Sequence, residues 1–280
     1  MKNILLPTDF SPNAWNATRY AIELYRKKPC TFYLLNTYTP AIVHSRFMAA
    51  TASGGIIDDN VKTLSENGLK ETLEQIETEC KYDHHSFEII SSFSLLTEEI
   101  KDLIETADID LIVTGTKGAS GFEEVFMGSN TVRIIKSVRK CPVLVIPEKY
   151  DYKKPSSIAF ATDFKRNFSL DIMKPLTSLA KNLGAAVHVV HINESEALDK
   201  YQQSNKDMLL DLLEPLEHQM HWMPYFSGKS DVMQYFLEEF DMDMLALVHY
   251  KHGFLEELIR EPVVKRVAFH TQIPLLVLPE

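Results

Sequence analysis

The chain has 280 residues, of which 45% are hydrophobic, and this is enough apolar material for a sizeable core. Its formal net charge of −10 argues against a general nucleic-acid-binding surface. No apolar run reaches the ~18 residues of a membrane-spanning helix, and the chain opens directly on an apolar strand without a signal peptide. Cys30, Cys80 and Cys141 are odd in number and widely spaced, which predicts free thiols and a cytoplasmic protein.

Strand-like and helix-like patterns alternate along the first half of the chain. In chain order they predict a strand at Ile4–Pro7, a helix capped by Ser11, strands at Phe32–Leu35 and near Phe87–Ile90, a helix from a Thr97 cap to Thr106, a strand at Leu111–Thr114, a helix after Ser129 and a strand at Val143–Ile146. The segment from Tyr38 to Gly68 is predicted to be a mobile surface segment. Continuous apolar strands with right-handed crossovers predict an α/β fold with a doubly wound parallel sheet.

The second half repeats the first. It restarts at Ser157, where SIAFATDFK repeats NILLPTDFS, so that Asp163 takes the place of Asp9. The strand CPVLVIPE recurs as IPLLVLPE at the end of the chain, and a charged stretch with Pro155 separates the halves. These repeats predict two tandem domains at residues 1–148 and 157–280, joined by a linker at 149–156.

The most informative run combines glycines with a strand end and a helix start. Gly115, Gly118, Gly128 and Ser129 follow the spacing G-x2-G-x9-G-S, with the strand before Gly115 and the helix after Ser129. Bare backbone amides at a helix start bind phosphate, and Ser129 is expected both to cap the helix and to donate to a phosphate oxygen. The residues predicted to bind phosphate are Gly115, Lys117, Gly118, Gly128, Ser129, Asn130 and Thr131. Neither a G-x4-G-K-[ST] loop nor a G-x-G-x-x-G fingerprint is present.

This spacing resembles the ATP-binding motif of the universal stress protein family. The segments KNILLPTDFS and CPVLVIP also resemble the first and last strands of that family. The resemblance implies two five-stranded sheets of strand order 3-2-1-4-5, an adenine nucleotide alpha hydrolase-like fold. It also implies ATP, ADP or AMP as ligand, with or without Mg²⁺.

The implied strand order sets Asp9 opposite Gly115 across one crevice. A carboxylate there can accept hydrogen bonds from ribose, although Asp9 can equally cap the following helix. The resemblance implies that Thr37 meets adenine through its backbone, and Pro7 and Thr8 are predicted to line the same pocket.

The resemblance also implies that the final strands of the two halves, Val143–Ile146 and Leu275–Leu278, pair with each other. The chain would then form an intramolecular pseudo-dimer that acts on an unknown protein partner, with a homodimer left open. Neither nucleic acid nor membrane is expected as a partner.

The second half lacks the phosphate motif. The counterpart of Gly115 is Val248 or His249, and Arg260 and Glu261 replace Gly128 and Ser129. A glutamate at that helix start repels phosphate, so the nucleotide is predicted in the first domain alone.

Histidines are concentrated in the second half. His191, His249 and His252 follow strands and form a candidate zinc site, or else their rings fill an emptied pocket. The leading hypothesis is therefore a nucleotide-binding regulatory protein of the stress response. The alternatives are a slow ATPase, for which no catalytic base is evident, and a sensor of metals or small ligands that uses the histidine-rich half.

Overall fold

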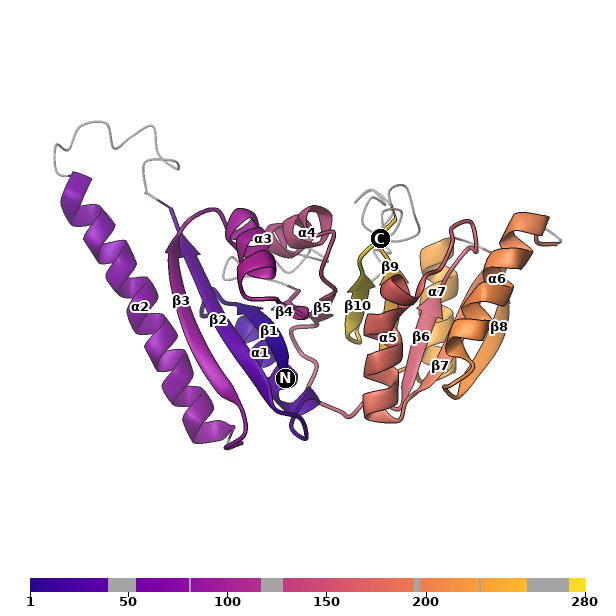
Figure 1. The fold of residues 1–280 in the computed structure, drawn as a ribbon, viewed down its shortest axis with the longest axis horizontal. Helices are drawn as coiled ribbons and strands as arrows, with labels where there is room; N and C mark the ends of the chain where they lie inside the picture. Colours follow the sequence, from indigo (N-terminus) through magenta and orange to yellow (C-terminus); the bar gives the residue numbers. More distant parts are fainter. Residues whose placement is uncertain (40–53, 81, 117–127, 194–196, 227, 251–271) are drawn as a thin grey trace. The chain divides into compact units, whose positions relative to one another are not determined.

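The computed structural model describes residues 1–39, 54–80, 82–116, 128–193, 197–226, 228–250 and 272–280. The chain divides into two compact units, Met1–Cys141 and Pro142–Glu280. The first unit contains, in chain order, β1 (Lys2–Pro7), α1 (Pro12–Leu24), β2 (Cys30–Tyr38), α2 (Gly54–Glu79), β3 (Ser86–Phe93), α3 (Leu96–Thr106), β4 (Leu111–Gly115) and α4 (Ser129–Ser137). The second contains β5 (Val143–Ile146), β6 (Ser157–Ala161), α5 (Leu170–Leu183), β7 (Ala186–Asn193), α6 (Lys200–Leu213), β8 (His218–Pro224), α7 (Lys229–Glu239), β9 (Met244–Val248) and β10 (Leu275–Leu278) (Figure 1).

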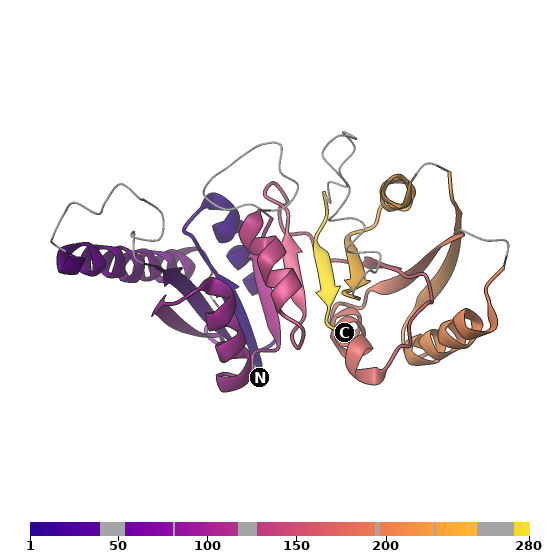
Figure 2. The same cartoon turned by 90° about the horizontal axis from the view of Figure 1, so that it is seen from above.

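The strands of the first unit lie in the order β3-β2-β1-β4, and each neighbouring pair is parallel. Helices α1 and α2 cover one face of this sheet, and α3 and α4 cover the other (Figure 2). The apolar residues of β1, β2 and β4 are mostly buried because both faces of these strands carry helices, whereas β3, at the edge of the sheet, has no buried residue. This arrangement confirms the predicted doubly wound parallel fold.

The strands of the second unit lie in the order β5-β10-β9-β6-β7-β8. From β10 to β8 every pair is parallel, so β8-β7-β6-β9-β10 reproduces the predicted order 3-2-1-4-5. Strand β5 pairs antiparallel with β10, with Leu144 opposite Leu276. The expected pairing of the two final strands is therefore present, and both strands belong to the second unit. The domain bounds expected from the sequence remain a prediction.

Two expectations about helices were wrong. Part of the segment predicted to be mobile forms α2, whose Leu69 and Ile76 are fully buried and which packs along β2 and β3. Burial of that apolar stripe stabilises a helix whose other residues are largely polar. Helix α3 begins at Leu96 after an extended Leu95, so Thr97 lies inside the helix and is not its cap.

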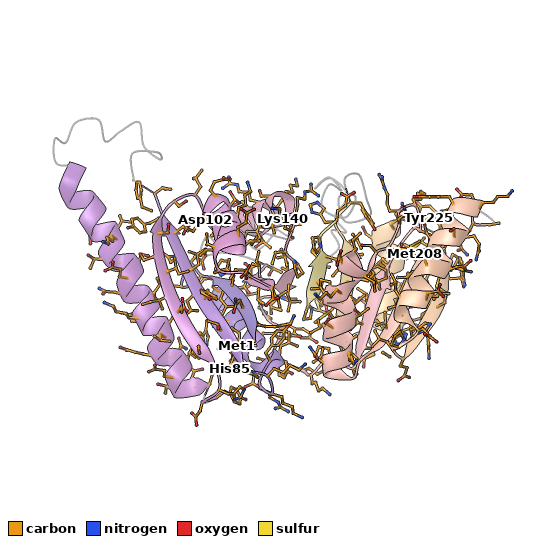
Figure 3. The ribbon with its side chains drawn as sticks, in the orientation of Figure 1. Met1, His85, Asp102, Lys140, Met208 and Tyr225 are labelled. Atoms are coloured by element: carbon orange, nitrogen blue, oxygen red, sulfur yellow. The ribbon has the colours of Figure 1, made fainter. Side chains whose placement is uncertain are left out.

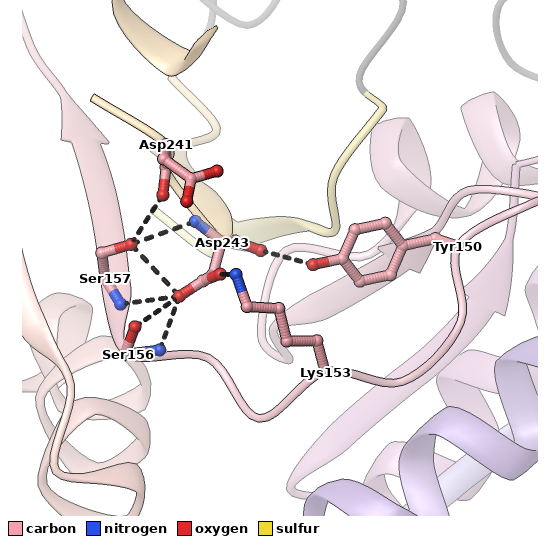
Figure 4. A network of polar contacts seen from close by, with 6 residues as sticks. All are labelled: Tyr150, Lys153, Ser156, Ser157, Asp241 and Asp243. Atoms are coloured by element: carbon pink, nitrogen blue, oxygen red, sulfur yellow. Dashed lines mark hydrogen bonds and ion pairs between the residues drawn. The ribbon is translucent and has the colours of Figure 1, made fainter. Parts of the chain in front are cut away.

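A buried carboxylate fixes the segment before β6 to the second unit (Figure 4). Asp243, 3% exposed, accepts Lys153 Nζ at 2.7 Å on Oδ1. Its Oδ2 accepts Ser156 N at 2.7 Å, Ser156 Oγ at 2.8 Å, Ser157 N at 3.1 Å and Ser157 Oγ at 3.2 Å. Although burial alone would raise it, the Lys153 and Ser156 hydrogen bonds lower the pKa of Asp243 to about 2. The counterpart in the first unit, Asp110, is exposed and accepts Asn3 N at 2.9 Å.

His85 lies in the first unit just before β3, near the amino ends of the strands (Figure 3). Its ring meets the ring of Phe32 edge-on with the centroids 5.1 Å apart. Burial lowers the pKa of His85 to about 4, and the neighbouring His84 acts in the same direction. None of the helices in the described ranges has an apolar stretch long enough to cross a membrane.

Candidate functional site

The candidate site begins where β1 leaves the sheet. Thr8 N donates to Leu35 O at 2.8 Å, which extends the hydrogen bonding between β1 and β2 one residue beyond Pro7, the end of β1. The chain then turns sharply: Phe10 N donates to Thr8 Oγ1 at 3.0 Å, and Phe10 has a φ of +63°. Ser11 N donates to Asp9 Oδ1 at 3.1 Å. This turn holds the exposed carboxylate of Asp9 beside the strand end.

Ser11 starts α1 as predicted. Its Oγ accepts Ala14 N at 3.2 Å, and Pro12 occupies the first helical turn, where its missing N–H costs nothing. The helix cap is therefore Ser11, and Asp9 braces the turn before it. The backbone N–H of Ser11 holds one oxygen of this carboxylate in position.

Gly115 ends β4, as predicted, because another side chain needs the space. A Cβ at this position would lie 2.7 Å from the side chain of Asn13 in α1. Asn13 is 3% exposed and its Nδ2 lies 3.4 Å from Thr116 Oγ1. Sequence reasoning missed Asn13 and Thr116, and the available signal was a polar amide on the otherwise apolar face of α1.

Helix α4 starts at Ser129, one residue earlier than expected. Gly128 is its N-cap and contributes no side-chain hydrogen bond, so the prediction that Ser129 caps the helix was wrong. Gly128 takes the extended conformation of the cap itself, which places Ser129 in the first turn. Ser129 and Asn130 are exposed. Within the described part of the chain, the N-cap residue therefore offers no side chain to the amides at the positive end of the helix.

Thr131 ties this helix start to the strand end. It is buried, and its Oγ1 donates to Gly115 O at 2.8 Å. Gly128 N donates to Thr116 O, which holds the start of α4 beside the residue that follows β4. Thr131 was predicted to contact phosphate, but its hydroxyl is engaged with the strand. Gly115, Gly128, Ser129 and Asn130 thus lie together at one edge of the sheet.

The remaining predicted residues lie on the neighbouring strand ends. Pro7 pairs with Leu35 in the sheet, and Thr37 of β2 pairs with Ser92 of β3. Thr8 O accepts Asn36 Nδ2 at 2.7 Å, a contact that sequence reasoning did not foresee. Lys117, Gly118 and His252 lie outside the described residues.

In the second unit, larger side chains stand at the strand end that corresponds to Gly115. Strand register aligns Ile4 with Leu111 and Ile158 with Met244, so the counterpart of Gly115 is Val248 and not His249. Two residues further on, Tyr250 donates its hydroxyl to Asn167 O at 3.2 Å.

Burial raises the pKa of the Tyr250 hydroxyl, and the negative charges of Glu280 and Asp163 add to that shift. A half-buried phenol therefore lies near Asp163, the counterpart of Asp9. At this strand end, Val248 takes the place of Gly115, and Tyr250 follows two residues later.

Two of the three candidate metal-binding histidines, His191 and His249, are described, and both are buried in the second unit. His191 is 5% exposed; its Nδ1 lies 3.0 Å from Thr162 O, and its ring stacks on Phe164 at 4.9 Å. His249 is buried, and its backbone N donates to Leu278 O at 2.9 Å. Within the described ranges no cluster of three or more His, Cys, Asp or Glu side chains could hold a metal ion. His191 thus fills space between aromatic rings, one of the two uses foreseen for it.

Comparisons with known proteins agree with this architecture. The model of the universal stress protein family matches residues 1–147. Universal stress protein MJ0531 of Methanocaldococcus jannaschii is 30% identical over 145 residues, which cover 52% of this chain and 81% of that protein. Universal stress protein Slr1230 of Synechocystis is 23% identical over 296 residues, which cover 99% of both chains. The crystal structure of a universal stress protein from Archaeoglobus fulgidus has the same fold, with a TM-score of 0.73 and 18% identity over 99% of this chain and 98% of that one.

Proposed function

Because this chain belongs to the universal stress protein family, we propose that it is a stress-response regulator that binds one adenine nucleotide, in its first unit. One observation supports this most directly. The exposed start of α4 has no side-chain cap, and it is tied through Thr131 to the strand end at Gly115. A helix start of this kind, at the carboxyl edge of a parallel sheet, is suited to phosphate.

We assign each part of the nucleotide to a different group of the described residues. The amides of Ser129 and Asn130 and the Ser129 hydroxyl bind phosphate, while Thr131 positions the helix. Asp9 accepts hydrogen bonds from the ribose, since its carboxylate is already oriented by Ser11 N. Pro7, Thr8 and the backbone of Thr37 border the base. Lys117 and Gly118 complete the phosphate loop on the strength of the motif alone.

The second unit binds no nucleotide in this way. Val248 carries a side chain where Gly115 has none, and Tyr250 lies near Asp163. The bound nucleotide therefore biases one unit, and the chain reports its presence to a protein partner. We place this activity in the cytoplasm, where three free, buried thiols persist. The paired halves serve as an intramolecular pseudo-dimer, and light scattering of the purified chain tests for a further homodimer.

Hydrolysis is expected to be slow. Among the described residues of the proposed site, Asp9 is the one ionisable side chain, and it is engaged in the turn before α1. Phosphoryl transfer to water needs an oriented nucleophile and stabilisation of charge on the γ-phosphate, for which an exposed serine and backbone amides provide little. If Mg²⁺ accompanies ATP, Asp9 is the described carboxylate available to it.

Nucleotide content of freshly purified protein tests the proposal. We expect one adenine nucleotide per chain after denaturation, identified by chromatography and mass spectrometry. Ser129→Asp should weaken ATP binding at least tenfold, because its charge repels phosphate at the helix start. The same charge favours the helix dipole, so the thermal midpoint should not fall.

The matched control is Arg260→Asp, which places an aspartate in the second half at the sequence counterpart of Gly128, next to Glu261, the counterpart of Ser129. It should leave ATP binding unchanged. Two nucleotides per chain, or wild-type affinity in Ser129→Asp, would contradict the proposal.

A further inference from the structure

A hollow lies in the first unit, on the side of α2. It has a volume of about 530 Å³, within the range of small-molecule sites. It is lined by Phe10, Asn36, Tyr38, Val61, Leu64, Ser65, Asn67, Gly68, Glu71, Thr72 and Gln75. None of the residues proposed for the nucleotide is among them. The hollow is therefore distinct in its lining from the phosphate-binding edge at Gly115 and Ser129.

The ring of Phe10 forms one wall. The turn after β1 holds Phe10 at a positive φ and leaves it 41% exposed. Gly68 of α2 meets this ring directly, since a Cβ there would lie 2.6 Å from the ring. A large apolar side chain held in a strained backbone conformation and left partly open to solvent is typical of a ligand wall.

The second unit has the same turn but fills the space beside it. Phe164 has a φ of +55° and is 0% exposed. His191 contacts the strand-end threonine carbonyl as Asn36 does in the first unit, and it stacks on Phe164. Asn205 of α6 donates to Phe164 O at 2.8 Å, so the helix after β7 contacts Phe164 through an amide side chain, whereas α2 contacts Phe10 through Gly68. The hollow of the first unit is therefore a consequence of its side chains and not of the fold.

The groups that fill the closed copy indicate what suits the open one. Trp222 lies next to His191, with the ring centroids 5.3 Å apart. Strand register makes Ser91 its counterpart in the first unit, where Ser91 Oγ lies 2.8 Å from Ser65 Oγ. The ammonium of Lys206 lies 6.0 Å from the centroid of the Trp222 ring. An indole ring with an ammonium over it thus lies beside His191, and Asn36, the counterpart of His191, lines the hollow of the first unit.

Charge in the hollow favours the same chemistry. Glu71 is the one ionisable carboxylate among the lining residues, and no lysine or arginine lines the hollow in the described part of the chain. The other polar groups are neutral amides and hydroxyls. Phosphates and carboxylates would find no cation here, whereas an aromatic amine gains from Glu71 and from the rings of Phe10 and Tyr38.

We propose that the hollow between Phe10 and α2 is a second ligand site, which takes a planar aromatic amine with no phosphate or carboxylate. The amine lies toward Glu71 and the aromatic ring lies on Phe10. The site is independent of the nucleotide.

Isothermal titration of the full chain tests this site with tryptamine as the probe and indole-3-propionate as its anionic counterpart. One tryptamine should bind per chain, at least tenfold more tightly than indole-3-propionate, and excess ATP should leave that affinity unchanged. Glu71→Gln should remove most of the preference for the amine. Absence of tryptamine binding, equal affinity for the two probes, or displacement of tryptamine by ATP would overturn the proposal.

Two substitutions copy the closed unit into the open one. Gly68→Asn should weaken tryptamine binding at least tenfold because Gly68 lines the hollow, and Ser91→Trp should do the same because Ser91 Oγ lies 2.8 Å from Ser65 Oγ of the lining. Both variants should leave ATP binding intact, which also reports that the unit is folded. Lys70→Asn, on the same helix but outside the lining, is the matched control and should bind tryptamine like the wild type. Wild-type tryptamine affinity in both filled variants would place the ligand elsewhere and refute the assignment.

Discussion

The turn after the first strand occurs twice in this chain and ends in two different environments. Phe10 and Phe164 share the sequence Thr-Asp-Phe, a positive φ and the same hydrogen bond to the preceding threonine hydroxyl. Phe10 is 41% exposed beside a hollow, whereas Phe164 is fully buried under His191. The backbone that shapes a site can therefore be kept while the site itself is filled.

The strand ends beside these turns differ in the same direction. The first unit has Gly115 next to a helix start whose cap, Gly128, has no side chain, and the second has Val248 followed by Tyr250, whose hydroxyl donates to Asn167 O. A duplicated fold thus retains its core on both sides and its open edge on one. The following predictions test this difference, beginning with the largest expected effect.

Removal of the two phenylalanine rings should separate the units most clearly. Phe164→Ala empties a fully buried position and should cost about 4 kcal/mol of unfolding free energy, whereas Phe10→Ala should cost about 1 kcal/mol. Both variants keep the same strained backbone, so the difference reports burial. The chain has two tryptophans, Trp15 in the first unit and Trp222 in the second. Denaturant unfolding followed by tryptophan fluorescence therefore reports on both units. Equal losses for the two variants would show that the units are packed alike around the turn.

The paired aspartates before β4 and β9 should differ next. Asp243→Ala removes an acceptor from several donors in a buried place and should destabilise the second unit by about 3 kcal/mol. Asp110→Ala removes an exposed acceptor and should cost about 0.5–1 kcal/mol in the first unit. Trp15→Phe and Trp222→Phe backgrounds report the second and first units, respectively. A loss below 1 kcal/mol for Asp243→Ala would show that the segment before β6 is held by other contacts.

Acid should weaken the second unit through the same carboxylate. The pKa of Asp243 is lowered from 3.8 to about 2, so its contribution is complete above pH 4 and is lost as the pH falls toward 2. The loss amounts to about 2 kcal/mol at 1.36 kcal/mol per pKa unit. Stability profiles of the wild type and Asp243→Asn should therefore converge in this range, with the wild type more stable above it. Parallel profiles from pH 6 to 2 would assign the acid sensitivity to other groups.

The two serines at helix starts should give the smallest and most specific contrast. Ser11→Ala removes a cap that accepts Ala14 N and should cost about 1 kcal/mol. Ser129→Ala removes no cap, so stability should change by less than ~0.5 kcal/mol while ATP binding weakens several-fold. Calorimetric titration and thermal unfolding on the same samples separate the two effects. A destabilised Ser129→Ala with normal ATP affinity would reverse the roles inferred for these serines.

Local sequence signals predicted the strands and helices whose pattern or capping residues lie within the element itself. Strands β1, β4 and β5 were found because continuous apolar runs need burial on both faces. Helix α1 was found because Ser11 marks its start and apolar residues follow at helical spacing. Gly115 was correctly placed at a strand end. The start of α4 was placed one residue late, because Gly128 can act as a cap through its backbone alone.

Contacts between distant segments could not be predicted. Helix α2 was missed since its buried residues are few and its stability comes from packing on β2 and β3. Asn13 beside Gly115 and Asn36 beside Thr8 were missed because each partner lies on another element. The equivalence of Asn36 and His191 is not evident from the residue types and emerges only from the strand register.

By itself, the sequence determined the alternation of strands and helices, the repeat of Thr-Asp-Phe in both halves and the glycine spacing that links the chain to its family, because these depend on short-range periodicity and residue spacing. The strand order was implied by the family resemblance. Only the tertiary structure decided which copy of the turn stands open. That outcome depends on the summed volumes of side chains from a turn, two strands and a helix, and these meet only when the sheet has formed.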